Sequence, residues 1–293
     1  MGGPGLGARP SFEPPDRRRP GERLCVMSTT TQPDETSRSP APIPTDEEIA
    51  EYATTGYLVW RGAIAPADVE KISAAVDELE RWAGAGPGRE GGPGLHHFEL
   101  TDSGPALARS EDFLAHSDVL RRLVTTGRIP ELLERLLGEP AVIFKEKINY
   151  KQPGGAGFAP HQDAAAYRFV DHHVSVMVPI DPATIASGTL YFAHKPPGET
   201  LLPNERGRIT PEAVAALVWE PVELAPGDLV FFDSYTPHYS QTNTTERARR
   251  AAYLTYNRVS LGSHRDTYYA DKRAEFAAEG DDFAGERVRL SIS

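Results

Sequence analysis

The feature that most constrains the fold is a change in character after Pro140. From there on the chain consists of short apolar segments punctuated by Gly and Pro, a pattern typical of strands joined by tight turns. The expected strands cover residues 141–144, 145–151, 174–180, 188–192, 229–232 and 250–256. Many short strands of this kind predict a mainly β domain built as a sandwich or jelly roll.

The preceding residues predict helices that flank this β structure. Thr45 and Glu48 form a Ser/Thr-x-x-Glu capping box, so a helix should begin here. A short apolar strand is expected at 57–60, and Pro66 suits the first turn of a second, amphipathic helix. One or two further helices are expected within 111–137.

Two other segments are expected to lack regular structure. Residues 1–44 hold nine of the 26 prolines and few large apolar side chains, so we predict a disordered tail followed by one domain over 45–293. Residues 84–94 are rich in glycine and predict a loop that is either a lid over the site or a surface linker.

Composition narrows the classes of partner. A formal net charge of −11 argues against a nucleic-acid surface, which needs a basic stripe, and favours a small-molecule substrate. The lone cysteine, Cys25, excludes an intrachain disulfide, and no apolar run is long enough to span a bilayer or to form a signal peptide. We therefore expect a cytoplasmic protein, as a monomer or homodimer.

The sequence His-x-Asp occurs three times, at His116, His161 and His264. Only His161 and Asp163 have a strand-like setting, in which residues two apart share a face, together with a suitable downstream histidine, His238. The first pair lies in a helical pattern, and no histidine follows the third. Two histidines and one carboxylate leave three positions open on an octahedral metal, as in non-heme Fe(II) oxygenases.

Beyond His238 lies a candidate anion site. Arg249 comes eleven residues after His238, at the start of an expected strand, and its guanidinium fork suits the far carboxylate of a dicarboxylic cosubstrate. Ser240 can add a hydroxyl group. Successive strand residues face opposite sides, so only one of Arg249 and Arg250 can point inward.

These motifs resemble the phytanoyl-CoA dioxygenase family of Fe(II)- and 2-oxoglutarate-dependent oxygenases. The likeness covers most of residues 46–273 and rests on KINYKQPGG, PHQD, SGTLYFA, PGDLVFFDS and PHYSQTN, followed by Arg249. It implies a double-stranded β-helix, cupin-like, that uses Fe(II), 2-oxoglutarate and O2, with His161, Asp163 and His238 as ligands. The offset of Arg249 from His238 matches the family, which favours Arg249 over Arg250.

The same resemblance implies further roles. Asn149 falls where relatives place an asparagine against 2-oxoglutarate, and Lys147 flanks it. Asp163 favours hydroxylation, because related halogenases lack the carboxylate ligand. The C-terminal run after Arg250 is similar to members acting on small polar metabolites, such as aminoalkylphosphonates or natural-product intermediates. The tripeptide at 193–195, Ala-His-Lys, departs from the usual Gly-Ser-His and leaves the pocket's shape open.

Other functions fit parts of this pattern. A jelly-roll module that senses a ligand without turnover would need the metal set but not Arg249 with Asn149. A zinc hydrolase would use the same ligands with a general base, which is not evident. A basic cluster near the C-terminus is either a solvated surface or a device that captures an anionic substrate: Arg258, Arg265, Lys272 and Arg273.

Overall fold

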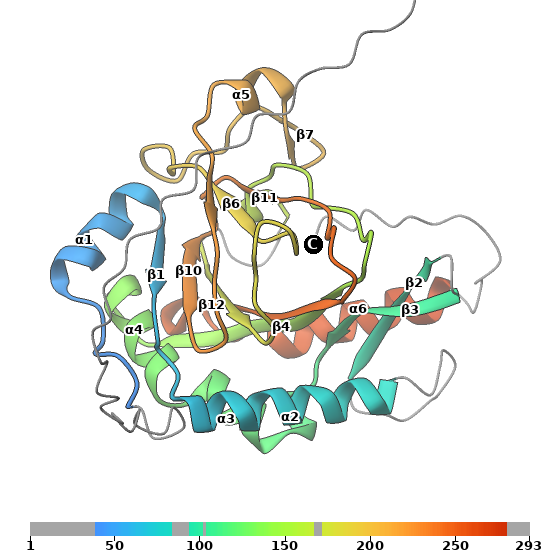
Figure 1. Cartoon of the computed structure of the whole chain (residues 1–293). Helices are drawn as coiled ribbons and strands as arrows, with labels where there is room; N and C mark the ends of the chain where they lie inside the picture. The colour runs from blue at the N-terminus through green and yellow to red at the C-terminus, as the bar shows by residue number, and fades with distance from the viewer. Residues whose placement is uncertain (1–38, 84–93, 102–103, 167–171, 280–293) are drawn as a thin grey trace, which may run out of the picture. The chain divides into compact units, whose positions relative to one another are not determined.

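The computed structural model describes residues 39–83, 94–101, 104–166 and 172–279 (Figure 1). Contacts divide the chain into residues 1–33 and 34–293, and everything described belongs to the second unit. Most of the expected tail and nearly all of the glycine-rich segment 84–94 lie outside the described residues. In the described part, no helix is both long and apolar enough to cross a membrane.

The prediction of a disordered tail over residues 1–44 is wrong for the last six of them, 39–44. The Ala41 amide donates to the carbonyl of Gly62 at 2.8 Å, and Trp60 Nε1 donates to the Pro42 carbonyl at 2.8 Å. These bonds hold the segment against the domain. The packed part of the chain therefore begins before Thr45.

The larger of two main sheets contains seven antiparallel strands. Their order across the sheet is β1 (Tyr57–Trp60), β10 (Leu229–Asp233), β5 (Val174–Pro179), β12 (Arg249–Arg258), β4 (Ala141–Lys151), β3 (Gly104–Glu111) and β2 (Leu95–Thr101). Strands distant in sequence therefore become neighbours. The metal-site segments come from connections that leave this sheet.

The smaller sheet contains β11, β6 and β9, in that order. Their bounds are His238–Ser240, Leu190–Phe192 and Glu220–Val222. A two-stranded ribbon, β7 (Asn204–Glu205) and β8 (Arg208–Ile209), joins this sheet through single bridges from His161 to Arg208 and to His238. The predicted jelly roll of mainly β character is confirmed.

Helices cover the outer face of the large sheet. They are α1 (Asp46–Thr55), α2 (Pro66–Ala83), α3 (Asp118–Thr125) and α4 (Arg128–Leu137), with the short α5 (Pro211–Ala215) elsewhere and α6 (Arg265–Glu279) beside β4. The Thr45–Glu48 capping box is present, as predicted. Figure 1 shows α2 and α3 running beneath the sheet, on the far side from β6 and β11.

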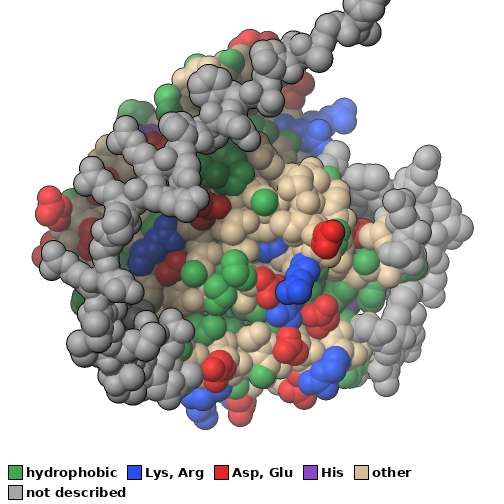
Figure 2. Space-filling view, in the orientation of Figure 1, with side chains coloured by type: hydrophobic (Ala, Val, Ile, Leu, Met, Phe, Trp, Pro, Cys, Tyr) green, Lys and Arg blue, Asp and Glu red, His purple; other side chains and the backbone are tan. Residues whose placement is uncertain are grey.

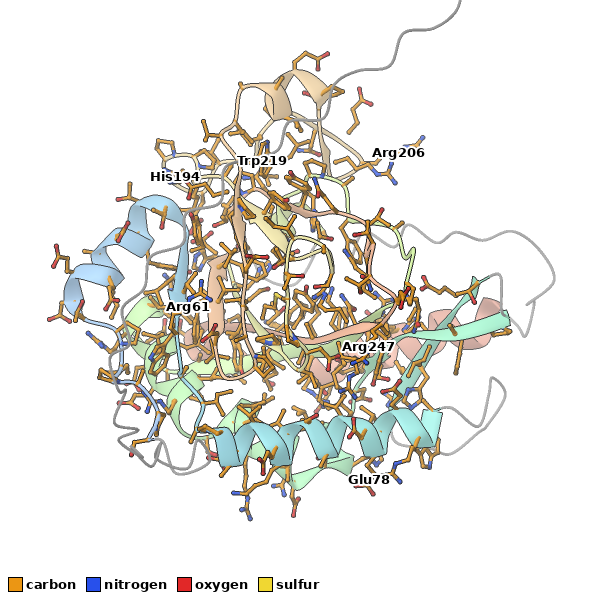
Figure 3. The ribbon with its side chains drawn as sticks, viewed as in Figure 1. Arg61, Glu78, His194, Arg206, Trp219 and Arg247 are labelled. Carbon is orange, nitrogen blue, oxygen red and sulfur yellow. The ribbon has the colours of Figure 1, made fainter. Side chains whose placement is uncertain are left out.

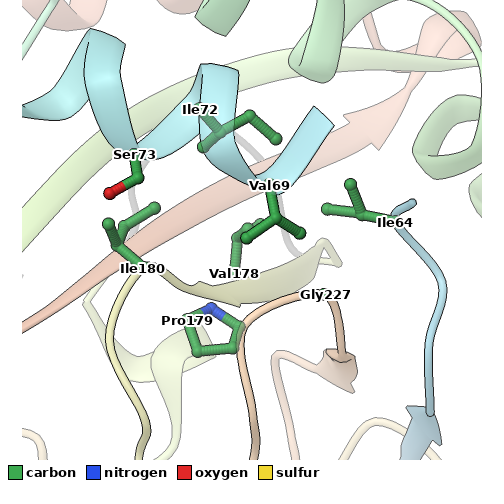
Figure 4. A pocket seen from close by; sticks show the side chains of 8 residues that line it. All are labelled: Ile64, Val69, Ile72, Ser73, Val178, Pro179, Ile180 and Gly227. Atoms are coloured by element: carbon green, nitrogen blue, oxygen red, sulfur yellow. The ribbon is translucent and has the colours of Figure 1, made fainter. Parts of the chain in front are cut away.

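Alternation along each strand divides the core in two. Val176 and Val178 of β5 and Leu254 of β12 face the helices, whereas Met177 faces the small sheet with Phe232. A small apolar gap remains between α2 and the β5 edge, lined by Ile72 and Val178 among others (Figure 4). This gap belongs to the helix-facing core, on the other side of the sheet from the polar face described below.

Three longer elements, β2, β3 and α6, were not expected from the sequence, and neither were the short β7, β8, β9, β11 and α5. β3 reads GPALARSE, whose polar residues and opening Gly-Pro give no apolar run, and it forms because β4 offers a neighbouring edge. α6 reads RDTYYADKRAEFAAE and lacks a strong apolar stripe. Tyr269 anchors it, through hydrogen bonds of its hydroxyl group with the backbone of Glu146.

Candidate metal centre and cosubstrate site

His161 and His238 are directly paired across a backbone bridge. The amide of each donates to the carbonyl of the other at 3.0 Å. Opposed residues of an antiparallel pair project to the same face, so the two rings meet, with centroids 4.2 Å apart. β11 holds His238 in place by pairing it on its other side with Phe192 of β6.

Asp163 completes the set from a different kind of element. The expectation of one strand carrying both His161 and Asp163 is wrong, because His161 makes single bridges and Asp163 opens a 3₁₀ turn, Asp163–Ala165. Its Oδ1 still lies 3.7 Å from His161 Nε2 and 3.9 Å from His238 Nε2. All three ligand atoms lie within 4.8 Å of one another, close enough to hold one metal ion.

Hydrogen bonds orient each of the three groups. Nδ1 of His161 lies 2.8 Å from the Ala159 carbonyl, and Nδ1 of His238 lies 3.0 Å from the Thr236 carbonyl. Only an Nδ1–H can donate to these oxygens, which leaves the Nε2 lone pairs facing Asp163. The Ser175 hydroxyl donates to Asp163 Oδ2 at 3.1 Å and leaves Oδ1 for a metal.

Electrostatics keep the three side chains in the protonation states that bind a metal. Burial, with the neighbouring His161, lowers the pKa of His238 to about 4, so its ring is neutral at pH 7. Burial raises the pKa of Asp163, but the polar and cationic groups around it, His161, His238 and Lys145, outweigh burial and hold the pKa well below its ordinary value. A neutral imidazole and an ionised carboxylate are the ligating forms.

The other two His-x-Asp pairs gather no third ligand. Asp118 is exposed and pairs with Arg121, while His264 is tied to the Leu261 carbonyl at 2.8 Å and Asp266 is fully exposed. Within the described ranges, His161, Asp163 and His238 are the one group of three with metal-binding geometry. Choosing this pair from the sequence agrees with that geometry.

Arg249 is the inward-pointing member of the arginine pair. It is 3% exposed, and its Nη2 donates to the Gly188 carbonyl at 3.2 Å. Arg250 instead faces outward and binds Asp181, Asp77 and Glu80. Among the described residues, no carboxylate pairs with Arg249, and its buried Nε has no hydrogen-bond partner.

Ser240 and Lys151 lie beside Arg249. Lys151 is its cross-strand partner on β4, and Lys151 Nζ donates to Ser240 Oγ at 2.9 Å. The Phe158 amide also donates to Ser240 Oγ, at 3.2 Å, so the serine's own hydroxyl proton remains available to an acceptor. Burial, together with Arg249, lowers the pKa of Lys151 to about 7. The site thus holds the Arg249 guanidinium beside a lysine that is only partly protonated near pH 7, and no described carboxylate pairs with either.

Asn149 and Lys147 share the inward face of β4 with Lys151. Asn149 opposes Ala251 of β12, and Lys147 opposes Tyr253, with its Nζ 5.5 Å from the ring centroid. From the sequence, Lys151 was expected, like Lys147, to flank Asn149 and to face the cosubstrate or the substrate. The strand pairing that puts Lys151 opposite Arg249 was not predicted.

Several secondary expectations change. His172 and His173 are consecutive, and from the sequence one was expected to line the pocket entrance and the other to be solvated. His173 is instead fully buried, and His172 Nε2 lies 3.0 Å from Asp233. In the unusual tripeptide, His194 is exposed at the periphery of Figure 3, whereas Lys195 binds Asp233 at 2.9 Å. The departure from Gly-Ser-His therefore leaves Lys195 in a structural ion pair.

The C-terminal basic cluster is neither simply solvated nor a single surface patch. Arg265 bridges Asp112, at 2.6 Å, and Glu146. Arg273 also binds Asp112. Lys272 lies 2.8 Å from Glu111. α6 is thus fastened to β3 and β4 by ion pairs.

Two imidazoles and one carboxylate converging within a jelly roll define the class of non-heme iron oxygenases. The family model for phytanoyl-CoA dioxygenase (PhyH) matches residues 52–251, and the chain belongs to this family. It is an Fe(II)- and 2-oxoglutarate-dependent dioxygenase that uses O2 to hydroxylate a small molecule. The resemblance read from the motifs is confirmed.

Curated relatives match over most of their length. The chain is 41% identical to a methylphosphonate hydroxylase from Gimesia maris over 84% of this chain and 93% of the relative. It is 38% identical to a 2-aminoethylphosphonate dioxygenase from an uncultured bacterium, over 82% and 92%. Among solved structures, EctD from S. alaskensis with 2-oxoglutarate and 5-hydroxyectoine gives a TM-score of 0.61 at 22% identity, over 78% and 83%, which supports the fold.

Proposed function

We propose that this enzyme hydroxylates a carbon atom of a small phosphonate, an aminoalkylphosphonate or a simpler alkylphosphonate. His161, Asp163 and His238 hold the iron in this proposal. Support comes from the convergence of their Nε2 and Oδ1 atoms within 4.8 Å and from the carbonyl and hydroxyl groups that orient them. When bound, Fe(II) with 2-oxoglutarate and O2 supplies the oxidant, and the balance is substrate, 2-oxoglutarate and O2 giving hydroxylated substrate, succinate and CO2.

Arg249 and Ser240 are the proposed anchor for the far carboxylate of 2-oxoglutarate. The observation that carries this step is the buried, unpartnered Nε of Arg249, which lies beside Lys151 and has no carboxylate partner among the described residues. Uncompensated charge of this kind is costly to bury, and a carboxylate offsets it. The hydroxyl proton of Ser240 can complete the contact.

Asn149 and Lys147 are proposed to contact the cosubstrate nearer the metal. They follow Lys151 along the same face of β4, each two residues further from Arg249. The Asn149 side chain has no hydrogen-bond partner among the described residues, so its amide can donate to a ligand oxygen. Burial, with Arg109 nearby, lowers the pKa of Lys147 to about 8.

The substrate class rests on the relatives. The two with the highest identity reported above are named for methylphosphonate and for 2-aminoethylphosphonate. The chain covers more than nine-tenths of each, so the comparison spans whole enzymes and not a shared module. A small, charged substrate also agrees with the polar inward face of β4.

We also propose that the enzyme works in the cytoplasm as a monomer or homodimer, without nucleic acid. The net charge of −11 and the single cysteine support this setting. On the face drawn in Figure 2, acidic and basic side chains are intermixed and form no basic stripe. Light scattering during gel filtration measures the oligomeric state.

The direct test is a reaction under ¹⁸O2 with Fe(II), 2-oxoglutarate and each phosphonate in turn. We expect one labelled oxygen in succinate and one in the phosphonate product, read by mass spectrometry. If 2-oxoglutarate binds but no phosphonate, at any concentration tried, promotes succinate formation, the substrate class is wrong. Ligand binding without any turnover would instead favour a sensor.

A further inference from the structure

The inward face of β4 has two cationic ends. Lys145, Lys147, Asn149 and Lys151 all lie on it, because side chains alternate along a strand. Lys151 belongs to the Arg249 end. Lys145 lies six residues away, roughly 20 Å along the strand. The proposed cosubstrate site accounts for the first end and leaves the second without a role.

The row that contains Lys145 leads directly to the metal centre. Lys145 opposes Thr255 of β12, and Thr255 opposes Ser175 of β5, so the three side chains share one face. Ser175 Oγ lies 3.1 Å from Thr255 Oγ1 and 3.1 Å from Asp163 Oδ2. A group bound at Lys145 is therefore separated from Asp163 by two hydroxyl-bearing residues.

Other cations gather around Lys145. Lys145 Nζ lies 5.9 Å from the centroid of the Tyr268 ring, and Lys272 Nζ lies 5.4 Å from the same centroid. Glu111 opposes Lys147 across β3 and β4, and its carboxylate binds Lys272 at 2.8 Å. The group formed by Lys145, Lys147 and Lys272 is called the lysine cluster below.

The lysine cluster is buried, and its cationic groups lie close enough to repel one another. Lys145 is 3% exposed, and the Lys272 side chain is 12% exposed. Arg109 adds a further cation, 2.7 Å from Glu111, and the carboxylates of Glu111 and Asp163 act on both Lys145 and Lys147. Burial, then Lys147, lowers the pKa of Lys145 well below its usual value. An anion with more than one charge would offset this repulsion.

We propose that the lysine cluster is the subsite for the tetrahedral oxyanion of the substrate, which under the proposed function is its phosphonate group. Three acceptor oxygens and up to two negative charges suit several ammonium groups that approach from β4 and α6. Arg249 binds the cosubstrate at one end of β4, and the lysine cluster binds the substrate toward the other. Asp163, a proposed metal ligand, is hydrogen-bonded to Ser175, which lies in the same cross-strand row as Thr255 and Lys145.

The test is anaerobic titration calorimetry on the Fe(II)-loaded, full-length protein with Lys145→Met. Methionine keeps an unbranched apolar side chain and removes the charge. We expect affinity for methylphosphonate and 2-aminoethylphosphonate to fall at least tenfold, while affinity for 2-oxoglutarate stays within about twofold. Lys151→Met should do the reverse, and Lys71→Met, on the exposed surface of α2, should change neither.

Stability separates binding from a structural role. Burial disfavours the charged form of Lys145, and methionine removes this cost together with the lysine's contacts, so Lys145→Met should unfold at about the same temperature as the wild type. Should this variant fail to fold, Lys272→Met on α6 replaces it, with an expected loss of at least threefold in phosphonate affinity. Unchanged phosphonate binding, or equal loss of phosphonate and 2-oxoglutarate binding, overturns the proposal.

Inorganic phosphate serves as a probe that does not depend on turnover. If phosphate binds the wild-type protein and Lys145→Met weakens that binding tenfold, the subsite stands, even when no phosphonate is hydroxylated. In that case only the phosphonate substrate of the proposed function fails. If phosphonates are hydroxylated and Lys145→Met leaves their KM unchanged, the enzyme function stands and the subsite fails.

Discussion

At the scale of single residues, the proposed metal centre depends on which nitrogen of each histidine carries its proton. The carbonyls of Ala159 and Thr236 fix both protons on Nδ1, and Ser175 fixes one oxygen of Asp163. The sequence indicates the three ligands but not these partners. Two of them are backbone oxygens, which any residue type supplies.

Asp163→Ala should abolish tight metal binding. Loss of an outer partner alone typically costs about 10–100-fold in affinity, so removal of a ligand should cost more than about 100-fold. Asp118→Ala, in the first His-x-Asp pair, is the matched control and should bind metal normally, since Asp118 is exposed and pairs with Arg121. Competition titration with a metal indicator measures both. Equal affinities would contradict the assignment.

Arg249→Lys should raise the KM for 2-oxoglutarate at least tenfold, because a lysine keeps the charge but loses the two-pronged geometry. Arg250→Lys should leave that KM unchanged, since Arg250 binds Asp181 outside the site. Steady-state kinetics with varied 2-oxoglutarate compare the two variants. A larger effect from Arg250 would mean that the two side chains had been assigned to the wrong faces.

At the scale of elements, alternation along β4 and β12 explains how one sheet serves both core and site. The period of two is visible in the sequence, and it places Lys145, Lys147 and Lys151 on one face of the strand. The partners of that face were not predictable, because β3 and α6 reach it only through the tertiary fold. Glu111 and Lys272 come from those two elements.

The C-cap of α1 controls the loop that carries His238. Gly56 has φ +83°, and an added Cβ would lie 2.2 Å from Thr236 Oγ1. Gly56→Ala should lower the free energy of unfolding by about 1–3 kcal/mol and weaken metal binding. Gly138→Ala, at another left-handed cap with open space around it, should cost only the backbone strain and leave metal affinity intact. Urea unfolding and metal titration report the two effects.

Glu111 links β3 to α6 and should make stability depend on acid pH. Burial raises its pKa, but Arg109, Lys272 and His97 outweigh burial and lower it to about 2, against an ordinary 4.5. The stabilisation, about 3 kcal/mol, is therefore complete above pH 4.5 and lost as pH falls toward 2.

Glu111→Gln should lack this component of the pH dependence. Urea unfolding of the wild type and the variant between pH 6 and pH 3 measures it, with Asp68→Asn as the control at an exposed ion pair. The wild type should lose its advantage over Glu111→Gln as the pH falls. Parallel curves would show that the Glu111 carboxylate contributes nothing to this dependence.

At the scale of the whole molecule, the fold and the reaction class were predictable and the substrate contacts were not. Short strands punctuated by Gly and Pro indicated the jelly roll, and local motifs identified the family. The ordered segment 39–44 was missed because its contacts, such as Trp60 with Pro42, join residues whose own pattern is irregular. Long-range pairing of this kind leaves no periodic signal.

The central claim is that the His161, Asp163 and His238 set and Arg249 bind one cosubstrate between them. Anaerobic calorimetric titration of 2-oxoglutarate into Fe(II)-loaded protein tests it most directly. We predict one molecule bound per chain, with binding that weakens when a chelator removes the metal and again in Arg249→Lys. No binding, or binding that is indifferent to both the metal and Arg249, would contradict the account.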